Sequence, residues 1–490
     1  MRQTEIFSSR WALILAALGM AIGTGNIWRF PRIAAQNGGG SFLIPWIIFL
    51  FLWSIPLLIV EFAMGKATRY GTVGAFGKLI GKKFTWMGVF VGFCSMAIMF
   101  YYSVVMGWCV KYFVSSLYGA VGLTQSKQFW ESFTSGYQPI LFHFIAMSVG
   151  AFVIYKGVVR GIERANKILI PSLVVLLILA AVRALTLPGA VDGLNFFFKP
   201  ELGKLLNYRT WLEALSQSAW STGAGWGLIL TYAVYMKKQE DIVLNSFIAG
   251  LGNNAASLLA GLVILPTIFA ILPFEDAMEA VNAGNTGLTF IWIPQLFLRM
   301  PLGSFFMVVF FLALTFAALS SLIAMIELAT RIFMDAGLNR HRAILFVGLF
   351  GFLLGLPSAR SLNFFNNQDW TWGIGLIVSG MFFAFAVMKY GNDNFRRNLI
   401  NQEGNDWQAG IWFNLVIRYI IPLEFVALIF WWFYQAIASY DPEGWWNPFH
   451  TFSLGTCIFQ WGLAIGVFIL LNNWIYKKTI GHDNRKANLC

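Results

Sequence analysis

Long apolar runs dominate the chain, and two of them, 84–110 and 304–326, contain no charged residue. A helix that crosses a membrane needs about 20 mostly apolar residues. Hydrophobic residues make up 58% of the 490 residues and charged residues 11%, whereas an ordinary globular protein is about 25% charged. A chain so poor in charge cannot cover a water-exposed surface. We therefore predict an all-α polytopic membrane protein, which excludes a soluble enzyme, a nucleic-acid binder and a disordered scaffold.

The apolar runs predict about twelve transmembrane helices. They lie near 11–35, 41–65, 84–113, 139–155, 166–187, 211–236, 242–272, 303–334, 342–358, 369–389, 410–436 and 449–476. Most of the 34 Lys and Arg residues fall in the two termini and in every second connection. Cytoplasmic connections carry such an excess of basic residues. We expect a multi-pass protein of the cell (inner) membrane with both termini in the cytoplasm, its surface in contact with the lipid bilayer.

Two of the expected spans are interrupted by glycine, at Gly19–Asn26 (GMAIGTGN) and at Ser221–Gly227 (STGAGWG). Each glycine inside a helix costs about 1 kcal/mol relative to alanine. One such cluster alone fits close helix packing through small residues. Two clusters about 200 residues apart, each in the first span of a five-span block, instead indicate an internal repeat with broken helices.

This pattern divides the chain into six parts. They are a cytoplasmic N-terminal segment at 1–10, a first five-helix repeat at 11–187, an extracellular loop at 188–210, a second five-helix repeat at 211–389, helices 11 and 12 at 390–476, and a cytoplasmic tail at 477–490.

The broken helices suggest cation binding, because interrupted helices free carbonyl oxygens and expose a half-helix N-terminus. Polar residues accompany the breaks: Asn26, Ser221, Asn253, Ser320 and Ser321. A single serine in a membrane helix usually bonds its own backbone, but the set supplies hard neutral oxygens that suit Na⁺. The chain has no His-x-x-x-His, Gly-x-Ser-x-Gly or Walker-type motif, so we predict that it is not an enzyme.

Several motifs in order along the chain resemble those of the neurotransmitter:sodium symporters, most closely the bacterial branch of that family. They are LILAALGMAIGTGNIWRFP at Leu13–Pro31, NGGGSFLIP at Asn37–Pro45, GIER at Gly161–Arg164, DGLNF at Asp192–Phe196, LTYAVY at Leu230–Tyr235, LSSLIA at Leu319–Ala324, and the region of Asp369. The resemblance implies a 5+5 inverted repeat plus two helices, with helices 1 and 6 broken. It also implies sodium-coupled import of an amino acid by alternating access.

The resemblance further implies two sodium sites and a substrate pocket. The first sodium site comprises Ala21, Asn26, Ser221 and Asn253, and the second comprises Gly19, Ile22, Ala317, Ser320 and Ser321. The substrate pocket comprises Met20, Ala21, Gly23, Thr24, Gly25, Ile98, Tyr102, Trp220, Ser221, Gly223, Trp226, Ser321 and Met325.

Gly23 bears on the substrate, because the monoamine transporters of the family carry an aspartate at this position. A glycine here implies that the substrate brings its own carboxylate, so we expect an amino acid. Trp220 and Trp226 narrow the pocket and Gly223 opens it, which favours a neutral, apolar amino acid. The residues do not say which one.

The resemblance places an outer gate at Arg29 and Asp369, above an aromatic lid of Tyr102 and Trp226, and one half of an inner gate at Asp335. The N-terminal arginine expected opposite Asp335 is missing, so either Arg2 takes its place or the inner lock is weaker.

Gln217, Ser221, Asn253 and Ser257 resemble the chloride site of animal members. Trp46, at the position of an expected tyrosine, departs from that pattern. We leave open whether chloride, or a proton on another group, balances charge.

Three further alternatives remain open at this stage. A proton-coupled amino acid carrier would differ from the leading interpretation only in its ion. A substrate sensor on the same scaffold would need a longer cytoplasmic extension than either terminus offers. The acids Glu61 and Glu327 lie within apolar segments, where an ionisable residue is functional by default, but a structural hydrogen-bonding role fits both.

Overall fold

The computed structural model describes residues 5–123, 125–402 and 405–481, and this part of the chain contains helices and no strand. Ten of its helices are long and apolar enough to cross a membrane, and a bent pair, Arg10–Ala21 with Gly25–Gln36, makes an eleventh. The all-helical polytopic class is therefore confirmed.

The first half of the chain supplies these elements: α1 (Arg10–Ala21), η1 (Gly25–Arg29), α2 (Phe30–Gln36), α3 (Gly40–Phe49), η2 (Leu50–Ser54), α4 (Ile55–Thr68), α5 (Thr72–Ile80), η3 (Lys82–Phe84), α6 (Thr85–Leu117), α7 (Ala120–Leu123), α8 (Ser126–Ser135), α9 (Gln138–Tyr155), η4 (Val158–Glu163), α10 (Arg164–Leu185), α11 (Ala190–Phe198), α12 (Leu202–Leu205), α13 (Tyr208–Ser221) and α14 (Leu228–Ala233).

The second half supplies α15 (Ile242–Ile271), α16 (Phe274–Asn282), α17 (Gly284–Gly287), η5 (Leu288–Trp292), α18 (Ile293–Leu298), α19 (Gly303–Asp335), α20 (Arg340–Arg360), α21 (Leu362–Tyr390), α22 (Asn392–Phe395), η6 (Arg396–Ile400), α23 (Trp412–Leu415), η7 (Val416–Ile420), α24 (Ile421–Gln435), η8 (Ala436–Tyr440) and α25 (Leu454–Thr479).

The count differs from the twelve expected spans at one place. The segment expected at 211–236 consists of α13 and α14, which are separated by Thr222–Gly227. Neither helix is long enough to cross a membrane alone. The glycines that marked this segment as broken are also the reason that it is not found as one continuous apolar helix.

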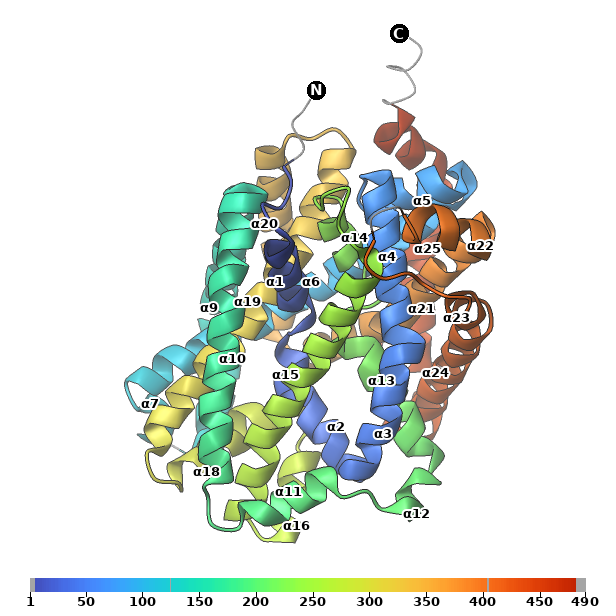
Figure 1. Cartoon of the computed structure of the whole chain (residues 1–490). Coiled ribbons are helices and arrows are strands. Elements are labelled where there is room, and N and C mark those ends of the chain that lie inside the picture. Colours follow the sequence, from blue (N-terminus) through green and yellow to red (C-terminus); the bar gives the residue numbers. More distant parts are fainter. Residues whose placement is uncertain (1–4, 124, 403–404, 482–490) are drawn as a thin grey trace.

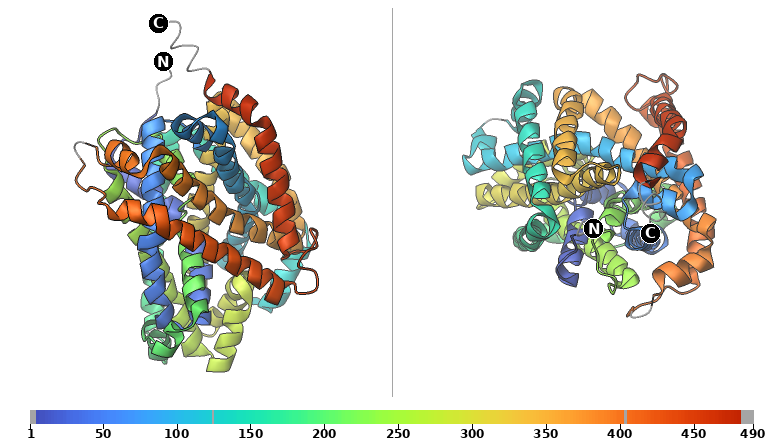
Figure 2. Two further views of the ribbon diagram at one scale, coloured as in Figure 1. Left: turned by 90° about the vertical axis from the view of Figure 1, so that its right-hand side faces the viewer. Right: turned by 90° about the horizontal axis from the view of Figure 1, so that it is seen from above.

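The broken helices lie at the centre of the bundle. In Figure 1, α1 and α14 run through the middle of the molecule, with α6 and α19 behind them and α9, α10 and α24 at the sides. Helices α6 and α19 pack along one another, and α1 contacts α10, α15 and α19. Helix α1 begins and α25 ends at the same end of the bundle (Figure 2). We call this the inner end and the opposite one the outer end.

Candidate functional site

The first break follows α1. The helix ends at Ala21, and Ile22 turns to an extended conformation (φ −82°, ψ 91°). The chain then resumes as η1 and α2, at an angle of 52° to α1. The backbone N–H of Gly23 donates to Asn26 Oδ1 (3.0 Å). Asn26 thus satisfies one of the backbone groups that the break frees, as a helix cap does.

The second break lies between α13 and α14 and is made by three glycines. Gly223, Gly225 and Gly227 have φ angles of +68°, +87° and +80°, a region that residues with a side chain rarely adopt. Glu61 of α4 accepts the N–H of Gly225 (2.7 Å) and of Leu230 (3.1 Å). The buried Glu61 carboxylate therefore supports the interrupted backbone, as the structural alternative for this residue supposed.

A cluster of neutral polar groups joins the two breaks. Asn26 Nδ2 donates to Asn253 Oδ1 (2.7 Å), and Asn253 Nδ2 donates to Ser221 Oγ (2.9 Å). The Oδ1 position of Asn253 also lies 2.8 Å from the carbonyl oxygen of Ser221 and 3.1 Å from that of Ala21. The structure thus brings together all four residues expected at the first sodium site. They come from α1, η1, α13 and α15.

The residues expected at the second sodium site are brought together in part. Ser321 Oγ of α19 lies 3.4 Å from the carbonyl oxygen of Gly19 and 3.3 Å from that of Met20. Ser320 Oγ instead donates to the carbonyl of Ala317 in its own helix (3.0 Å). In the described part of the chain, no side-chain hydrogen bond joins Ile22 to either serine.

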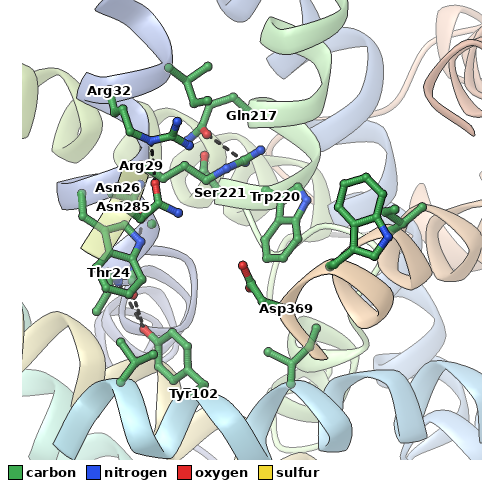
Figure 3. A pocket seen from close by; sticks show the side chains of 18 of the residues that line it. Thr24, Asn26, Arg29, Arg32, Tyr102, Gln217, Trp220, Ser221, Asn285 and Asp369 are labelled. Atoms are coloured by element: carbon green, nitrogen blue, oxygen red, sulfur yellow. Dashed lines mark hydrogen bonds between the residues drawn. The ribbon is translucent and has the colours of Figure 1, made fainter. Parts of the chain in front are cut away.

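A cavity of about 580 Å³ lies between the breaks, α6, α19 and α21. All thirteen residues expected in the substrate pocket line it. Its deep part is apolar on one side, with Met20, Ile98 and Met325. On the other side, the Tyr102 hydroxyl accepts hydrogen bonds from the N–H (3.2 Å) and the Oγ1 (3.3 Å) of Thr24 (Figure 3). Because both bonds use the oxygen of Tyr102, the phenol proton remains for donation to a ligand.

The outer part of the cavity carries charged residues. Arg29, Arg32, Arg209, Glu213 and Asp369 all line it. Arg209 is exposed, so the cavity opens at the outer end. In the described part of the chain, no lining residue belongs to the inner end. The cavity is therefore open toward the outer end and closed toward the inner end.

The expected outer gate is not closed in this conformation. Arg29 donates to Gln217 Oε1 (2.9 Å) and Ser216 Oγ (3.3 Å). The Asp369 carboxylate points into the cavity, apart from the Arg29 guanidinium (Figure 3), and no ion pair joins the two in the described residues. Arg29 Cζ lies 5.2 Å from the ring centroid of Trp220. Trp220 therefore contacts Arg29 directly, while Tyr102 and Trp226 of the expected lid line the same cavity.

The inner end is closed by the segment that leads into α1. Phe7 is buried, its N–H donates to the carbonyl of Tyr235 (3.0 Å), and its ring packs edge-on against Tyr232. Asp335 accepts the N–H of Gly71 (2.6 Å) and pairs with Arg331 (2.8 Å). Arg2, the alternative partner of Asp335, lies outside the described residues. The inner closure seen here combines a buried aromatic anchor with an ion pair inside α19.

Glu327 belongs to a second buried network near the inner end. Its carboxylate pairs with Arg340 (2.6 Å) and accepts the hydroxyl proton of Tyr235 (2.6 Å). Tyr235 is also the residue whose backbone binds Phe7. This network joins α19, α20 and the turn after α14, which agrees with the structural alternative for Glu327.

The residues expected at a chloride site are close to the sodium cluster. Ser257 Oγ accepts a hydrogen bond from Asn26 Nδ2 (2.8 Å), and Ser221 bonds Asn253. Gln217 Nε2 and Trp46 Nε1 are buried donors without a hydrogen-bond partner in the described residues. Buried polar groups are usually hydrogen-bonded, so these two N–H donors would suit an anion.

Two positions at the site were missed by the sequence analysis. An ideal Cβ on Gly373 of α21 would lie 2.0 Å from the Trp220 ring, so this glycine makes the slot that holds Trp220. Glu213 accepts hydrogen bonds from Trp431 (3.1 Å) and Gln435 (3.3 Å) of α24. Neither contact has a local sequence signal, because the partners are far apart along the chain.

Comparisons with known proteins agree with this geometry. The model of the sodium:neurotransmitter symporter family matches residues 4–138 and 134–481. A sodium-dependent transporter of Methanocaldococcus jannaschii is 32% identical over 449 residues, covering 87% of this chain and 90% of its own length. The sodium-dependent serotonin transporter of Drosophila melanogaster is 28% identical over 489 residues, covering 88% of this chain and 76% of its own.

A solved structure is also similar. The crystal structure of MhsT in complex with L-phenylalanine superposes with a TM-score of 0.77 at 30% identity. The match covers 87% of this chain and 99% of that one.

Proposed function

Because the chain belongs to the sodium:neurotransmitter symporter family, we propose that it imports a neutral, apolar amino acid together with Na⁺ by alternating access. The family is one of transporters, not enzymes. The outward-open cavity is the state that takes up ions and substrate from outside, and the closed inner end prevents their direct passage. In this proposal the inner end faces the cytoplasm, as the excess of basic residues there indicates.

The observation that carries the proposal is the oxygen cluster at Asn253. In the orientation that bonds Asn26, Asn253 Oδ1 lies within 3.1 Å of two carbonyl oxygens, those of Ala21 and Ser221. With the Asn253 amide turned over, its Nδ2 donates to both carbonyls, whereas in the orientation that bonds Asn26 the three oxygens leave a place for a cation. Hard neutral oxygens favour a hard cation such as Na⁺. We assign the first Na⁺ to this cluster, with Asn26 as a fourth ligand.

The second Na⁺ is assigned to the carbonyls of Gly19, Ile22 and Ala317 and the hydroxyls of Ser320 and Ser321. Ser321 already faces Gly19, whereas Ser320 is bonded within its helix. We expect the Ser320 hydroxyl to rotate from Ala317 toward the ion when it binds. The first site then takes backbone from helices 1 and 6, and the second joins the break of helix 1 to α19, so a change in either ion site acts on the broken helix 1.

A substrate carboxylate would offset part of the positive charge that the Na⁺ ions bring to the site. The deep cavity is lined by neutral groups, so two Na⁺ ions bring an excess of positive charge that a substrate anion offsets. The Tyr102 hydroxyl and the N-terminus of η1 after Gly23 both face this space, and helix N-termini favour anions. An ideal Cβ on Gly23 would lie 2.9 Å from Ser321 Oγ and 3.1 Å from the Tyr102 hydroxyl. A side-chain carboxylate at position 23 therefore has little room, and the substrate supplies its own.

The apolar wall sets the side-chain class of the substrate. Met20, Ile98, Met325, Trp220 and Trp226 line the cavity, and the two tryptophan rings pack edge-to-face with centroids 6.1 Å apart. Among the described residues, no charged group lies beside these five side chains to pair with a charged substrate side chain, since the charged lining residues belong to the outer part. The similar protein MhsT was solved with L-phenylalanine, which supports a large apolar amino acid.

Charge balance by chloride is part of the proposal. Gln217 Nε2 and Trp46 Nε1 are two of the buried donors without a partner in the described residues, and Gln217 lies one turn before Ser221 in α13. Animal members are expected to have a tyrosine at the position of Trp46. In this proposal the indole N–H of Trp46 replaces the hydroxyl group of that tyrosine as a hydrogen-bond donor.

The second candidate, proton coupling, is favoured by Glu424 of α24. It is buried, and neither of its carboxylate oxygens has a hydrogen-bond partner in the described residues. An ionisable side chain without a partner inside a spanning segment is a candidate for carrying a proton. The two candidates differ in the ion whose gradient drives uptake.

Uptake into proteoliposomes tests the proposal. Labelled phenylalanine would be offered under an inward Na⁺ gradient, with each of the other amino acids as unlabelled competitor, and with gluconate in place of chloride. We expect accumulation that needs Na⁺ and is blocked by apolar amino acids alone. Accumulation under a proton gradient without Na⁺, lost in Glu424→Gln, would instead support proton coupling. Indifference to gluconate would remove chloride from the proposal.

A further inference from the structure

Six lysines gather at one corner of the inner end. They are Lys78 of α5, Lys82 and Lys83 of η3, Lys389 of α21, and Lys477 and Lys478 of α25. All six are exposed. We call this set the lysine corner. In the described residues, α5, η3, α21 from residue 370 onward, and α25 contain no Asp or Glu.

The corner is held together by contacts between these elements. Asn472 of α25 donates to the carbonyl of Lys82 (2.9 Å) and accepts the N–H of Trp86 (2.8 Å). Two lysine ammonium groups lie over the Phe84 ring, Lys83 Nζ at 5.9 Å and Lys389 Nζ at 5.7 Å from its centroid. These lysines therefore extend from a fixed backbone and a shared aromatic ring, which brings charges from separate parts of the chain to one place.

Several other cations of the inner end are neutralised or bonded within the protein. Arg331 pairs with Asp335, Arg340 with Glu327, and Arg10 with Asp406. Lys66 donates to the carbonyl of Glu240 (2.8 Å). In the described residues, none of the six corner lysines is in an ion pair. Lys78 donates to the carbonyl of Thr68 (3.3 Å), so the corner gathers six cations that are bonded at most to neutral groups.

An apolar surface adjoins the corner. Helix α25 is the least covered of the spanning helices, with 28% of its most apolar stretch buried within the protein. Leu463, Leu470 and Trp474 are 61%, 83% and 62% exposed. Figure 2 shows α25 along the outside of the bundle, with its last turns beside α5. A ligand at the corner could pair an anionic group with the lysines and pack an apolar chain against the exposed side chains of α25.

We propose that the lysine corner binds the phosphate headgroup of an anionic phospholipid, whose acyl chains lie along α25. Clusters of four to eight basic residues next to a spanning helix attract anionic headgroups. A soluble phosphate would use the lysines alone, whereas a lipid uses the lysines and the exposed face of α25. The proposal needs only the membrane embedding of the chain, so it stands whatever the transported substrate proves to be.

Lipid binding to the purified, intact protein tests this directly, without Na⁺ or amino acid. Native mass spectrometry would compare phosphatidylglycerol with phosphatidylcholine, and inorganic phosphate would be added in a separate arm. We expect phosphatidylglycerol to bind about tenfold more tightly than phosphatidylcholine. The triple variant Lys82→Gln, Lys83→Gln, Lys389→Gln should lose this preference.

Two matched control variants separate the loss of lipid binding from the loss of charge elsewhere and from misfolding. Lys127→Gln, Lys199→Gln, Lys204→Gln removes the same charge at the other end and should keep the preference. Replacing the three corner lysines by arginine keeps the charge and should also keep it, which separates lost binding from lost folding. A preference that persists in the triple glutamine variant, or competition by inorganic phosphate as effective as that of the lipid, would overturn the proposal.

Discussion

The slot at Gly373 yields a prediction whose size follows from the structure. Trp220 lies beneath Arg29 and against Trp226, with its ring where the side chain of residue 373 would otherwise be. The Cβ of alanine at position 373 would lie 2.0 Å from Trp220 Cζ2 and 2.5 Å from Cη2. Carbon atoms in contact are about 3.5–4.0 Å apart. The ring must therefore withdraw by roughly 1.5 Å, away from α21 and into the cavity.

The displacement acts on substrate binding in two ways. Overpacking of this kind costs about 1–3 kcal/mol, and the contact of Arg29 with the Trp220 face contributes about 0.5–2 kcal/mol. The displaced ring also occupies space that the substrate side chain uses. If about 1–3 kcal/mol of these costs is lost from the free energy of substrate binding, the dissociation constant of the amino acid rises about 5- to 150-fold in Gly373→Ala.

Equilibrium binding of the transported amino acid to purified protein, at saturating Na⁺, measures this effect. Gly375→Ala is the matched control, because its Cβ meets Cys94 Sγ at 3.2 Å and does not approach Trp220. The double variant Gly373→Ala, Trp220→Phe should bind better than Gly373→Ala alone, since the smaller ring vacates the slot. Unchanged affinity in Gly373→Ala, or a double variant no better than the single one, would refute the reasoning.

Three other outcomes follow from the site. Gly23→Asp should lower amino acid affinity more than 100-fold, because the added carboxylate crowds Ser321 and Tyr102 where the substrate carboxylate binds; unchanged binding would contradict that placement. Ser257→Glu should make uptake independent of chloride, since a fixed carboxylate replaces the anion. Uptake into proteoliposomes in chloride and in gluconate would show this independence. Continued chloride dependence of uptake would argue against the site. Glu61→Ala should destabilise the protein by about 2–6 kcal/mol, as two buried N–H groups lose their acceptor; thermal unfolding in detergent checks this, and an unchanged midpoint would exclude the supporting role.

The helical architecture could be read from the sequence because its signals are local. A charge-free run such as 304–326 has few alternatives to a membrane helix, and a cluster such as Gly223–Gly227 has few alternatives to an irregular backbone. A search for long apolar helices misses the sixth span, where these two signals meet. Glycines and polar residues in the segment 211–236 leave two short helices, neither of which is a span by itself.

The cavity residues could be anticipated through the family resemblance, since the spacing of each motif fixes the pocket face of its helix. The state of the gate could not. Whether Arg29 bonds Asp369 or Gln217 depends on the conformation, and both partners are compatible with the same sequence. Gly373 was missed because its role exists only through the Trp220 ring, which reaches it from another helix.

The second break also limits how this transporter can change during evolution. Gly223 and Gly225 have positive φ angles, and side chains there would meet Met20 Sδ at 2.6 Å and the Gly380 backbone at 2.7 Å. Single substitutions at either position are penalised twice, by backbone strain and by collision. New substrate preferences are therefore reached most easily through the regular helices that face the break, at Ile98 and Met325. Selection can reshape those side chains one at a time while the ion-binding backbone stays unchanged.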